Sequence, residues 1–280
     1  MPHLRELEIG AMFWPWFEPA RTVAELKKIG VRCGQLGLAG NHDIGPSAVA
    51  EWKRVLAAED FALVTVFAAY TGEDYADIPT VERTVGFIPP ATRDERLART
   101  LALSDFAAAL GVKGIACHIG FVPEDHTDAN YVAVREMVRE VCDHAAKHGQ
   151  TFALETGQEP ANVLLEFFRD VNRPNLRINF DPANMILYGT GDPIEALGIL
   201  AAHVETVHAK DGDWPPKNVA GALGAERPLG QGSVGIERFV AKLKEVGHKG
   251  TLNIEREVEN LNERLRDMKM GVELLTRVRG

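Results

Sequence analysis

Short apolar runs alternate along the chain with stretches whose apolar residues recur every three or four positions. The runs are rich in Val, Ile, Leu and Phe and are bounded by polar residues and glycines, which is typical of buried strands. The longer stretches between them have the spacing of one helix face. The predicted strands are 7–13, 33–38, 62–68, 114–119, 151–155, 176–180, 204–209 and 251–255.

A helix is predicted after each of these strands. Glycines stand where the helices should stop, two aspartates stand where helices should start, and two prolines suit first-turn positions. These residues are Gly30, Gly111, Gly149, Gly247, Asp128, Asp192, Pro160 and Pro193. The predicted helices are 23–29, 47–58, 92–110, 128–148, 160–171, 193–200, 236–246 and a last one that includes 261–275.

Eight consecutive strand–helix units in about 250 residues match the size and order of a (β/α)8 TIM barrel. No linker-like stretch divides the chain, so we expect one α/β domain over residues 1–280. An open doubly wound sheet is the alternative. Two long segments, 69–91 and 210–235, follow strands, and in a barrel both would lie at the end that carries the chemistry.

Five of the predicted strands end in a polar residue that can bind a metal or move a proton. Three carboxylates at neighbouring strand ends would repel one another unless a cation lies among them. Any one acid alone could be a simple loop charge, but their coincidence favours one divalent ion. An oxygen-rich set with an imidazole suits Mn²⁺, Mg²⁺ or Co²⁺, and Zn²⁺ stays an alternative. The strand ends are His118, Glu155, Asp181, His208 and Glu255.

Several motifs in the second half of the chain resemble those of sugar isomerase/epimerase barrels, the xylose isomerase-like family. The resemblance runs from residue 118 onward. It implies that Glu155, Asp181, His208 and Glu255 hold one divalent metal, and that Glu155 and Glu255 also act as acid and base. The motifs are LET at 154–156, NFDPAN at 179–184, VHAKD at 207–211, LGQGSVGIERFV at 229–240 and GTLNIERE at 250–257.

The implied chemistry is the movement of a proton beside the carbonyl of a small sugar, through an enediolate that the metal stabilises. His118, Asn184 and Lys210 are candidate contacts for sugar oxygens, although an ion pair is an equal reading for Lys210. The run FWPWF at 13–17 offers Trp14, Trp16 or Phe17 as an apolar wall for a sugar ring.

The chain departs from ketose epimerases of this family at Asn184, where they tend to have His, and at Thr156 and Gly157. The epimerase substrate therefore does not carry over directly. A keto-sugar lyase or dehydratase, similar to inosose dehydratase, begins with the same proton abstraction and is kept beside the isomerase or epimerase. A metal-dependent endonuclease-like hydrolase and a non-catalytic sugar-binding barrel are the remaining alternatives.

Charge and composition exclude other classes of partner. The formal net charge of −9 opposes non-specific binding to nucleic acid or to an anionic membrane. Three widely spaced cysteines are typical of reduced thiols in a cytoplasmic protein, and no apolar run approaches the ~20 residues of a membrane span. We also expect a homo-oligomer, from the resemblance and from apolar surface in the 13–17 loop.

The glycine-rich stretch GQGSVG at 230–235 matches a dinucleotide-binding pattern but follows a loop instead of a strand. We therefore interpret the match as accidental. A phosphate site that uses this loop and Arg227 is a weaker hypothesis than a flexible lid.

Overall fold

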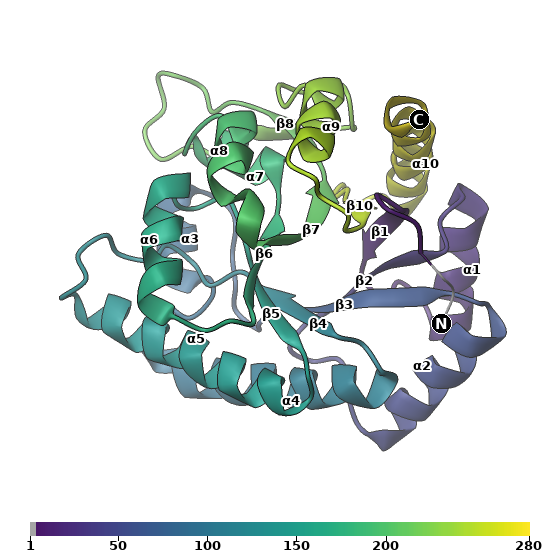
Figure 1. Cartoon of the computed structure of the whole chain (residues 1–280), viewed down its shortest axis with the longest axis horizontal. Coiled ribbons are helices and arrows are strands. Elements are labelled where there is room, and N and C mark those ends of the chain that lie inside the picture. Colours follow the sequence, from purple (N-terminus) through teal and green to yellow (C-terminus); the bar gives the residue numbers. More distant parts are fainter. Residues whose placement is uncertain (1–3) are drawn as a thin grey trace.

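Eight parallel strands close into a barrel in the computed structural model of the chain, which describes residues 4–280 (Figure 1). Each strand pairs with its neighbours in sequence order, and β1 closes the ring by pairing Ile9 with Leu252 of the last strand. The predicted TIM barrel is confirmed. The strands are β1 Ile9–Phe13, β2 Cys33–Leu38, β3 Ala62–Ala68, β4 Gly114–Cys117, β5 Thr151–Glu155, β6 Leu176–Phe180, β7 Val204–Ala209 and β10 Leu252–Ile254.

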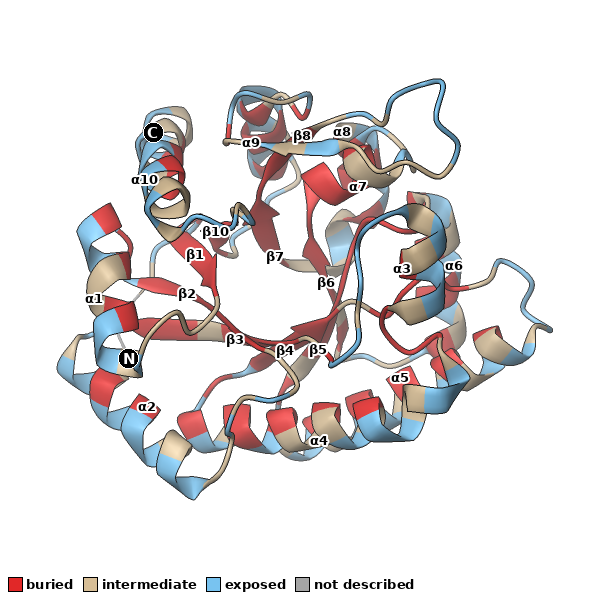
Figure 2. Ribbon diagram, turned by 180° about the vertical axis from the view of Figure 1, so that it is seen from behind, coloured by how far each residue is buried: buried red, intermediate tan, exposed pale blue. Residues whose placement is uncertain are grey.

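The helices cover the outside of the barrel, with their buried sides on the strands and their exposed sides in solvent (Figure 2). All eight predicted helices are present, with ends that differ from the predicted ones by a few residues. They are α1 Pro19–Ile29, α2 Pro46–Ala58, α4 Arg93–Leu110, α5 Ala129–Lys147, α6 Ala161–Val171, α8 Pro193–Leu200, α9 Ile236–Glu245 and α10 Leu261–Arg279. Two short α-helices and two 3-10 turns were not predicted: α3 Ile78–Thr84, α7 Pro182–Tyr188, η1 Pro90–Thr92 and η2 Ala201–His203.

Local sequence signals set the helix ends. The Asp128 carboxylate accepts a hydrogen bond from the backbone N–H of Asn130, and Asp192 accepts one from that of Ile194. These bonds satisfy N–H groups that have no partner inside the helix. Gly30 and Gly111 end α1 and α4 in the left-handed conformation that favours glycine.

A layer of polar side chains lies inside the barrel, beneath the carboxyl ends of the strands. The amide Nε2 of Gln35 donates to Asn179 Oδ1 at 3.0 Å and to Thr206 Oγ1 at 2.9 Å. Asn253 Nδ2 donates to the same threonine oxygen at 2.9 Å. Buried polar groups are tolerated when they are paired in this way, and such a network fixes the side chains above it.

The two long segments meet over the barrel mouth. The backbone N–H of Ile78, at the start of α3, donates to the carbonyl of Gly221 at 2.9 Å. The 210–235 segment also contains a small antiparallel pair, β8 Asp211–Asp213 and β9 Ala225–Arg227, which the apolar pattern does not predict. Both segments therefore have local structure that helps to enclose the site.

Three further sequence expectations concern the cysteines, membrane spans and the aromatic loop at 13–17. Cys33, Cys117 and Cys142 are buried and form no disulfide. Within residues 4–280, no helix is both long and apolar enough to cross a bilayer. The aromatic residues at 14, 16 and 17 are only half-exposed, so the loop at 13–17 offers less apolar surface than the sequence indicates. The predicted homo-oligomer then depends mainly on the resemblance.

Candidate metal centre at the barrel mouth

Four side chains predicted as metal ligands converge where the strands end. Glu155 is the last residue of β5, Asp181 directly follows β6, His208 lies in β7 and Glu255 directly follows β10. Each offers one nitrogen or oxygen atom, and these four atoms lie within 4.8 Å of one another. All four residues are buried. Parallel strands bring their carboxyl ends to one edge, which is why residues far apart in sequence meet here.

The four facing atoms have close neighbours but no hydrogen bonds. The Nδ1 atom of His208 lies 2.6 Å from Glu155 Oε1, 3.2 Å from Glu255 Oε2 and 3.7 Å from Asp181 Oδ2. Each of these four atoms is buried and lacks a hydrogen-bond partner. Three carboxylate oxygens and an imidazole nitrogen that all point at one spot repel one another unless a proton or a cation lies between them. The donor set therefore fits a divalent cation that takes oxygen ligands with one imidazole.

The orientation of His208 is set from the opposite side of its ring. Its Nε2 atom lies 2.9 Å from Oε1 of Gln35 in β2. Because the Gln35 amide oxygen can only accept, His208 Nε2 must carry a proton, and Nδ1 of the neutral ring then presents a lone pair to the acids. The ring of Phe67 packs 5.7 Å from the imidazole, centroid to centroid, and keeps it in place.

The electrostatics of the metal-free cluster show strong coupling between its groups. Burial alone would raise the pKa of Glu155, but the imidazoles of His118 and His208 outweigh burial and lower that pKa well below its ordinary value. Burial raises the pKa of Asp181 to about 6, although Lys210 acts against it. Burial also acts to raise the pKa of Glu255, but the charges of Lys210 and His208 outweigh it and lower that pKa to about 2. Without a metal, the protonated imidazoles and Lys210 balance the negative charge of the carboxylates. Binding of a metal would therefore release the proton on Nδ1 of His208.

A cavity of about 270 Å³ opens above the cluster. Of the four cluster residues, Glu155 and Glu255 line this cavity, whereas Asp181 and His208 lie behind them and are fully buried. This volume is slightly below the usual range of about 300–1,000 Å³ for ligand sites, which suits a small ligand. Its wall also includes all four predicted substrate contacts, His118, Asn184, Lys210 and Trp14.

Two of these residues pair directly with the glutamates. His118 Nε2 lies 2.5 Å from Glu155 Oε2, and its Nδ1 lies 3.1 Å from the amide nitrogen of Gln158. Lys210 Nζ lies 3.1 Å from Glu255 Oε2 and 2.6 Å from Glu257 Oε2. Both readings of Lys210 made from the sequence are therefore compatible with the structure, since it is an ion-pair partner and also borders the cavity.

Trp14 is the one of the three aromatic candidates that reaches this cavity. Its ring lies flat against Gly37 of β2, where a Cβ atom would come within 2.6 Å of the indole. Gly37 is thus required for the position of Trp14. Trp16 lines a smaller hollow that adjoins the cavity through Trp14, and Phe17 lies beneath the guanidinium of Arg21 at 3.5 Å.

Most backbone N–H groups of the glycine-rich loop at 230–235 already have partners within the protein. The Asp211 carboxylate accepts hydrogen bonds from the backbone of Gly230, Gly232 and Val234 at 2.9 to 3.1 Å. Arg227, the suggested phosphate partner, pairs with Asp213 at 2.7 Å. The structure therefore gives no support to a phosphate site in this loop, and it shows that Asp211 of VHAKD holds the loop in place.

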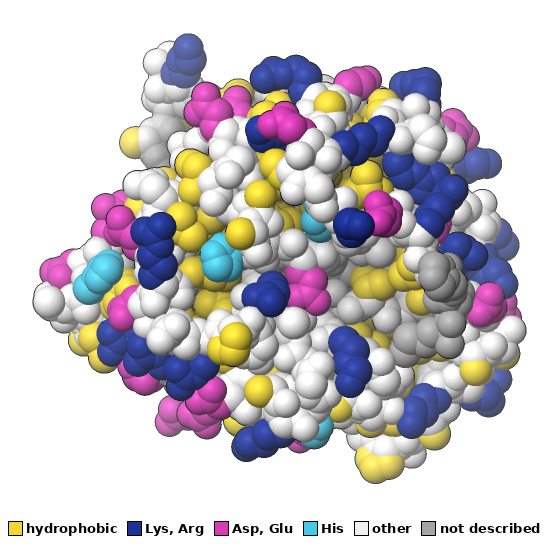
Figure 3. All heavy atoms as spheres, viewed as in Figure 1, with side chains coloured by type: hydrophobic (Ala, Val, Ile, Leu, Met, Phe, Trp, Pro, Cys, Tyr) yellow, Lys and Arg dark blue, Asp and Glu magenta, His cyan; other side chains and the backbone are white. Residues whose placement is uncertain are grey.

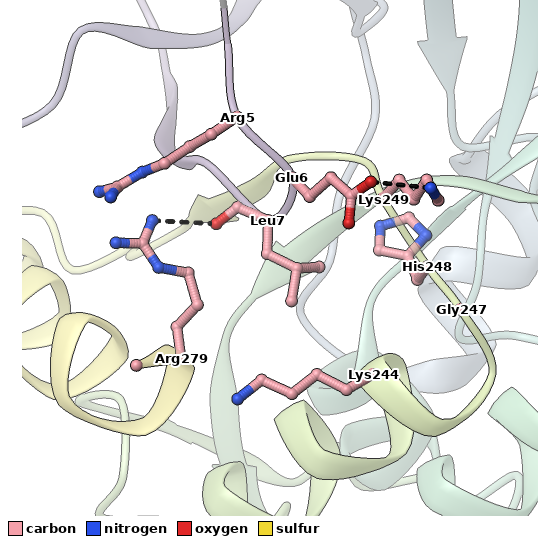
Figure 4. Close-up of a pocket in the computed structure, with 9 residues that line it drawn as sticks. Arg5, Glu6, Leu7, Lys244, Gly247, His248, Lys249 and Arg279 are labelled. Atoms are coloured by element: carbon pink, nitrogen blue, oxygen red, sulfur yellow. Dashed lines mark hydrogen bonds and ion pairs between the residues drawn. The ribbon is translucent and has the colours of Figure 1, made fainter.

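A further hollow lies at the other end of the barrel, where β1 and β10 begin (Figure 4). It is lined by basic side chains, but these already have partners: Lys249 pairs with Glu6 at 2.7 Å, and Arg279 donates to the Leu7 carbonyl at 3.3 Å. Acidic and basic side chains are interspersed on the face shown in Figure 3. The buried polar atoms without partners that could hold a metal therefore lie at the barrel mouth, whereas the basic groups of this hollow are already paired.

Several residues at the site were not singled out from the sequence. Gln35 is the most important of them, and the signal was its polar side chain in the middle of the apolar run CGQLGL. Gln158 follows the strand-five glutamate within the same short loop. Tyr75, in the segment before α3, and Tyr188, the last residue of α7, also line the cavity, and neither short helix was predicted.

Comparison with known proteins gives the family. The family model described as "Xylose isomerase-like TIM barrel" matches residues 23–278. The crystal structure of a xylose isomerase domain protein from Planctomyces limnophilus is 41% identical to the chain, covers 98% of both chains and superimposes with a TM-score of 0.93. The uncharacterized protein MJ1311 of Methanocaldococcus jannaschii is 26% identical over 204 residues, which span 66% of this chain and 64% of that relative. The match thus covers less than two thirds of the length of MJ1311.

More distant solved structures share the fold alone. A xylose isomerase-like TIM barrel protein from Mycobacterium smegmatis in complex with magnesium is 18% identical, with a TM-score of 0.66 over 93% of this chain and 89% of that one. Others include D-allulose 3-epimerase from Methylomonas sp. with D-allulose, at 17% identity and a TM-score of 0.70, and the probable 3-DHS dehydratase AsbF of Bacillus anthracis, at 17% and 0.69. On the family model and the Planctomyces structure together, the chain belongs to the xylose isomerase-like TIM barrel family.

Proposed function

We propose that the protein is a divalent-metal-dependent isomerase or epimerase of a small sugar, ketose or keto-polyol. The proposal rests on one arrangement of the cluster. Four buried atoms converge without hydrogen bonds, and of the four residues that supply them only Glu155 and Glu255 face the cavity. Residues that only hold a metal can be buried behind it. Residues that also move a proton must reach the substrate.

Glu155, Asp181, His208 and Glu255 would hold the metal, with Mn²⁺, Mg²⁺ or Co²⁺ favoured over Zn²⁺ by the three carboxylates. When bound, the ion supplies positive charge that polarises a substrate carbonyl and makes the neighbouring C–H more acidic. The magnesium complex of the Mycobacterium relative supports the choice of a hard cation.

The proton chemistry belongs to the glutamates. Glu155 and Glu255 come from β5 and from the end of β10, so they approach the cavity from different sides of the barrel. One carboxylate can remove a proton from the carbon beside the carbonyl, and the other can return one to the opposite face, which inverts that carbon. Return by the same carboxylate to the neighbouring carbon would give an isomerase instead.

The remaining wall of the cavity suits a small polyhydroxylated ligand. His118, Asn184 and Lys210 offer hydrogen-bonding groups, and Trp14 offers a flat apolar face for the C–H side of a sugar. The epimerase among the fold neighbours supports this substrate class. His118 and Lys210 also hold Glu155 and Glu255 in position through their ion pairs.

A keto-sugar dehydratase is the second candidate, and Lys210 favours it. Its ammonium group lies 3.1 Å from Glu255 at the cavity wall, where it could give a proton to a departing hydroxyl after the same abstraction step. The dehydratase among the fold neighbours supports this alternative. The products of the two reactions differ in mass, because a dehydratase removes one water from the substrate and an epimerase removes none.

Incubation in deuterated water tests the proposal. The metal-loaded enzyme is mixed with a panel of ketoses, keto-acids and inososes, and hydrogen exchange beside the carbonyl is followed by NMR and mass spectrometry. We expect metal-dependent exchange that Glu155→Gln or Glu255→Gln abolishes and that the exposed control Glu237→Gln leaves intact. Turnover without solvent deuterium would refute proton transfer, and binding without exchange on any compound would favour a non-catalytic sugar-binding barrel.

A further inference from the structure

A second group of metal-binding side chains lies on the outside of the barrel. His144 and His148 stand one helical turn apart at the end of α5, and both reach Asp105 on α4. The Nε2 atom of each imidazole lies 2.8 Å from the same oxygen, Asp105 Oδ1. We infer that Asp105, His144 and His148 form a second divalent-metal site, which binds ions of the zinc, nickel and copper class and ties α4 to α5.

The two helices hold these side chains in position before any ion binds. Residues four apart on a helix lie on the same face, and a pair of histidines with this spacing is a known way to present two imidazoles to one metal. Helices α4 and α5 run side by side along one edge of the barrel (Figure 1). The end of α5 is held by Lys113, whose Nζ donates to the His148 carbonyl at 3.1 Å.

The ligand set selects a different class of ion from the barrel mouth. Two imidazoles and one carboxylate suit Zn²⁺, Ni²⁺ or Cu²⁺, whereas the mouth offers three carboxylates and one imidazole. Around a tetrahedral zinc ion the ligand atoms stand roughly 3.3 Å apart, so the 2.8 Å contacts must open by roughly 0.5 Å. The Asp105 side chain is 59% exposed and free to make this shift, and solvent can supply the remaining ligand.

The position of the site separates it from the proposed reaction. In the barrel the helices run back against the strands, so the ends of α4 and α5 lie at the opposite end from the cavity. An ion there would link two neighbouring strand–helix units on the surface without contact with the cluster around His208. Its expected effect is greater stability of the folded chain, because the ion binds the folded state and not the separated helices.

Retention of the untagged protein on nickel-charged resin is the direct test, because an immobilised ion cannot reach the buried cluster in the mouth. We expect the parent to be retained, and His144→Gln and His148→Gln each to elute at a several-fold lower imidazole concentration. His126→Gln, which changes an exposed histidine elsewhere, is the matched control and should elute with the parent. Elution of both α5 variants with the parent would overturn the site.

Zinc stoichiometry by equilibrium dialysis gives a second, independent readout. The parent should bind one equivalent more than the His144→Gln/His148→Gln double variant, and Asp105→Asn should weaken the outer site at least about tenfold. Anomalous scattering at the zinc edge should place the ion between α4 and α5. Equal stoichiometry in parent and double variant, or an ion placed elsewhere, would refute the inference. Unchanged Mn²⁺ binding and far-UV circular dichroism of the double variant would show that the fold and the barrel-mouth cluster are intact.

Discussion

His208 and Gln35 share a hydrogen bond across the barrel interior, with 2.9 Å between the imidazole Nε2 and the amide Oε1. The amide nitrogen of Gln35 is already committed to Asn179 and Thr206, so the amide cannot turn its oxygen away from the imidazole without losing both bonds. A residue of β2 thus decides which nitrogen of a β7 histidine faces the acids. Loss of such a partner typically lowers metal affinity about 10- to 100-fold.

Replacement of Gln35 should weaken metal binding without touching a ligand. In Gln35→Leu the imidazole loses its fixed tautomer and orientation, and we expect the affinity for Mn²⁺ to fall about 10- to 100-fold. Competition with a chelator of known affinity measures the change. Thr251→Val is the matched control, because it removes a hydroxyl that bonds to Asn253 in the same polar layer but leaves both bonds of the Gln35 amide nitrogen in place. An equal loss in both variants would mean that the layer as a whole, and not the tautomer, supports the metal.

Metal ions should stabilise the folded chain through the mouth cluster. Binding to the folded state at a hundred times the dissociation constant is worth about 2.7 kcal/mol. We therefore expect the thermal midpoint to rise and saturate as Mn²⁺ is added, and the double variant Glu155→Gln/Glu255→Gln to show no such rise. Differential scanning fluorimetry with and without a chelator is the measurement. If added Mn²⁺ does not change the thermal midpoint of the parent, the cluster does not bind this metal.

Lys210 should matter for stability far more than an exposed lysine. It is 3% exposed and lies among Glu255, Glu257 and Asp181. Lys210→Met leaves these charges unbalanced, and we expect the metal-free chain to lose about 3–5 kcal/mol in urea unfolding. Lys249→Met breaks an ion pair with Glu6 in which both side chains are more than half exposed, and should cost no more than about 1 kcal/mol. Similar losses would show that Lys210 is not the counterion of the buried acids.

The buried carboxyl group of Glu159 should make stability depend on pH. Burial raises its pKa from 4.5 to about 7, although the Val122 N–H bonds to it. Between these pH values the folded chain holds a proton that the unfolded chain has released, so this group lowers stability as the pH rises through that window. Glu159→Gln keeps an acceptor for Val122 and cannot ionise.

We therefore expect Glu159→Gln to match the parent near pH 4.5 and to exceed its stability by about 1–3 kcal/mol above pH 7. Guanidinium unfolding at both pH values gives the comparison, with the exposed Glu140→Gln as control. A constant difference at all pH values would show that the carboxyl group titrates normally.

The strands and the metal ligands could be predicted because each is marked by a pattern of neighbouring residues in the sequence. Buried parallel strands are continuous apolar runs, and a carboxylate at the end of such a run stands out, as at Glu155 and Glu255. Asp181 has a double role that the sequence also hints at: it caps α7 through its contact with the Asn184 N–H at 3.0 Å, and it faces the cluster with its other oxygen.

The residues that were missed owe their roles to contacts across the barrel. Gln35 meets His208 only after the barrel closes, so its position inside an apolar run gave no information about its partner. The helix α3 is seven residues long and its first N–H bonds to Gly221, far along the chain. Short elements that depend on such distant partners lack the repeated pattern from which longer ones are predicted.

The hydrogen bond between Ile78 and Gly221 also bears on how this barrel could be re-engineered. Each of the two loops over the cavity contributes half of the contact, and Pro79 packs against Gly221 within 3.0 Å of where a Cβ would stand. A graft that takes one loop from a relative would meet the wrong surface on the other. Libraries that aim at new substrates should therefore recombine 69–91 and 210–235 as one inherited pair.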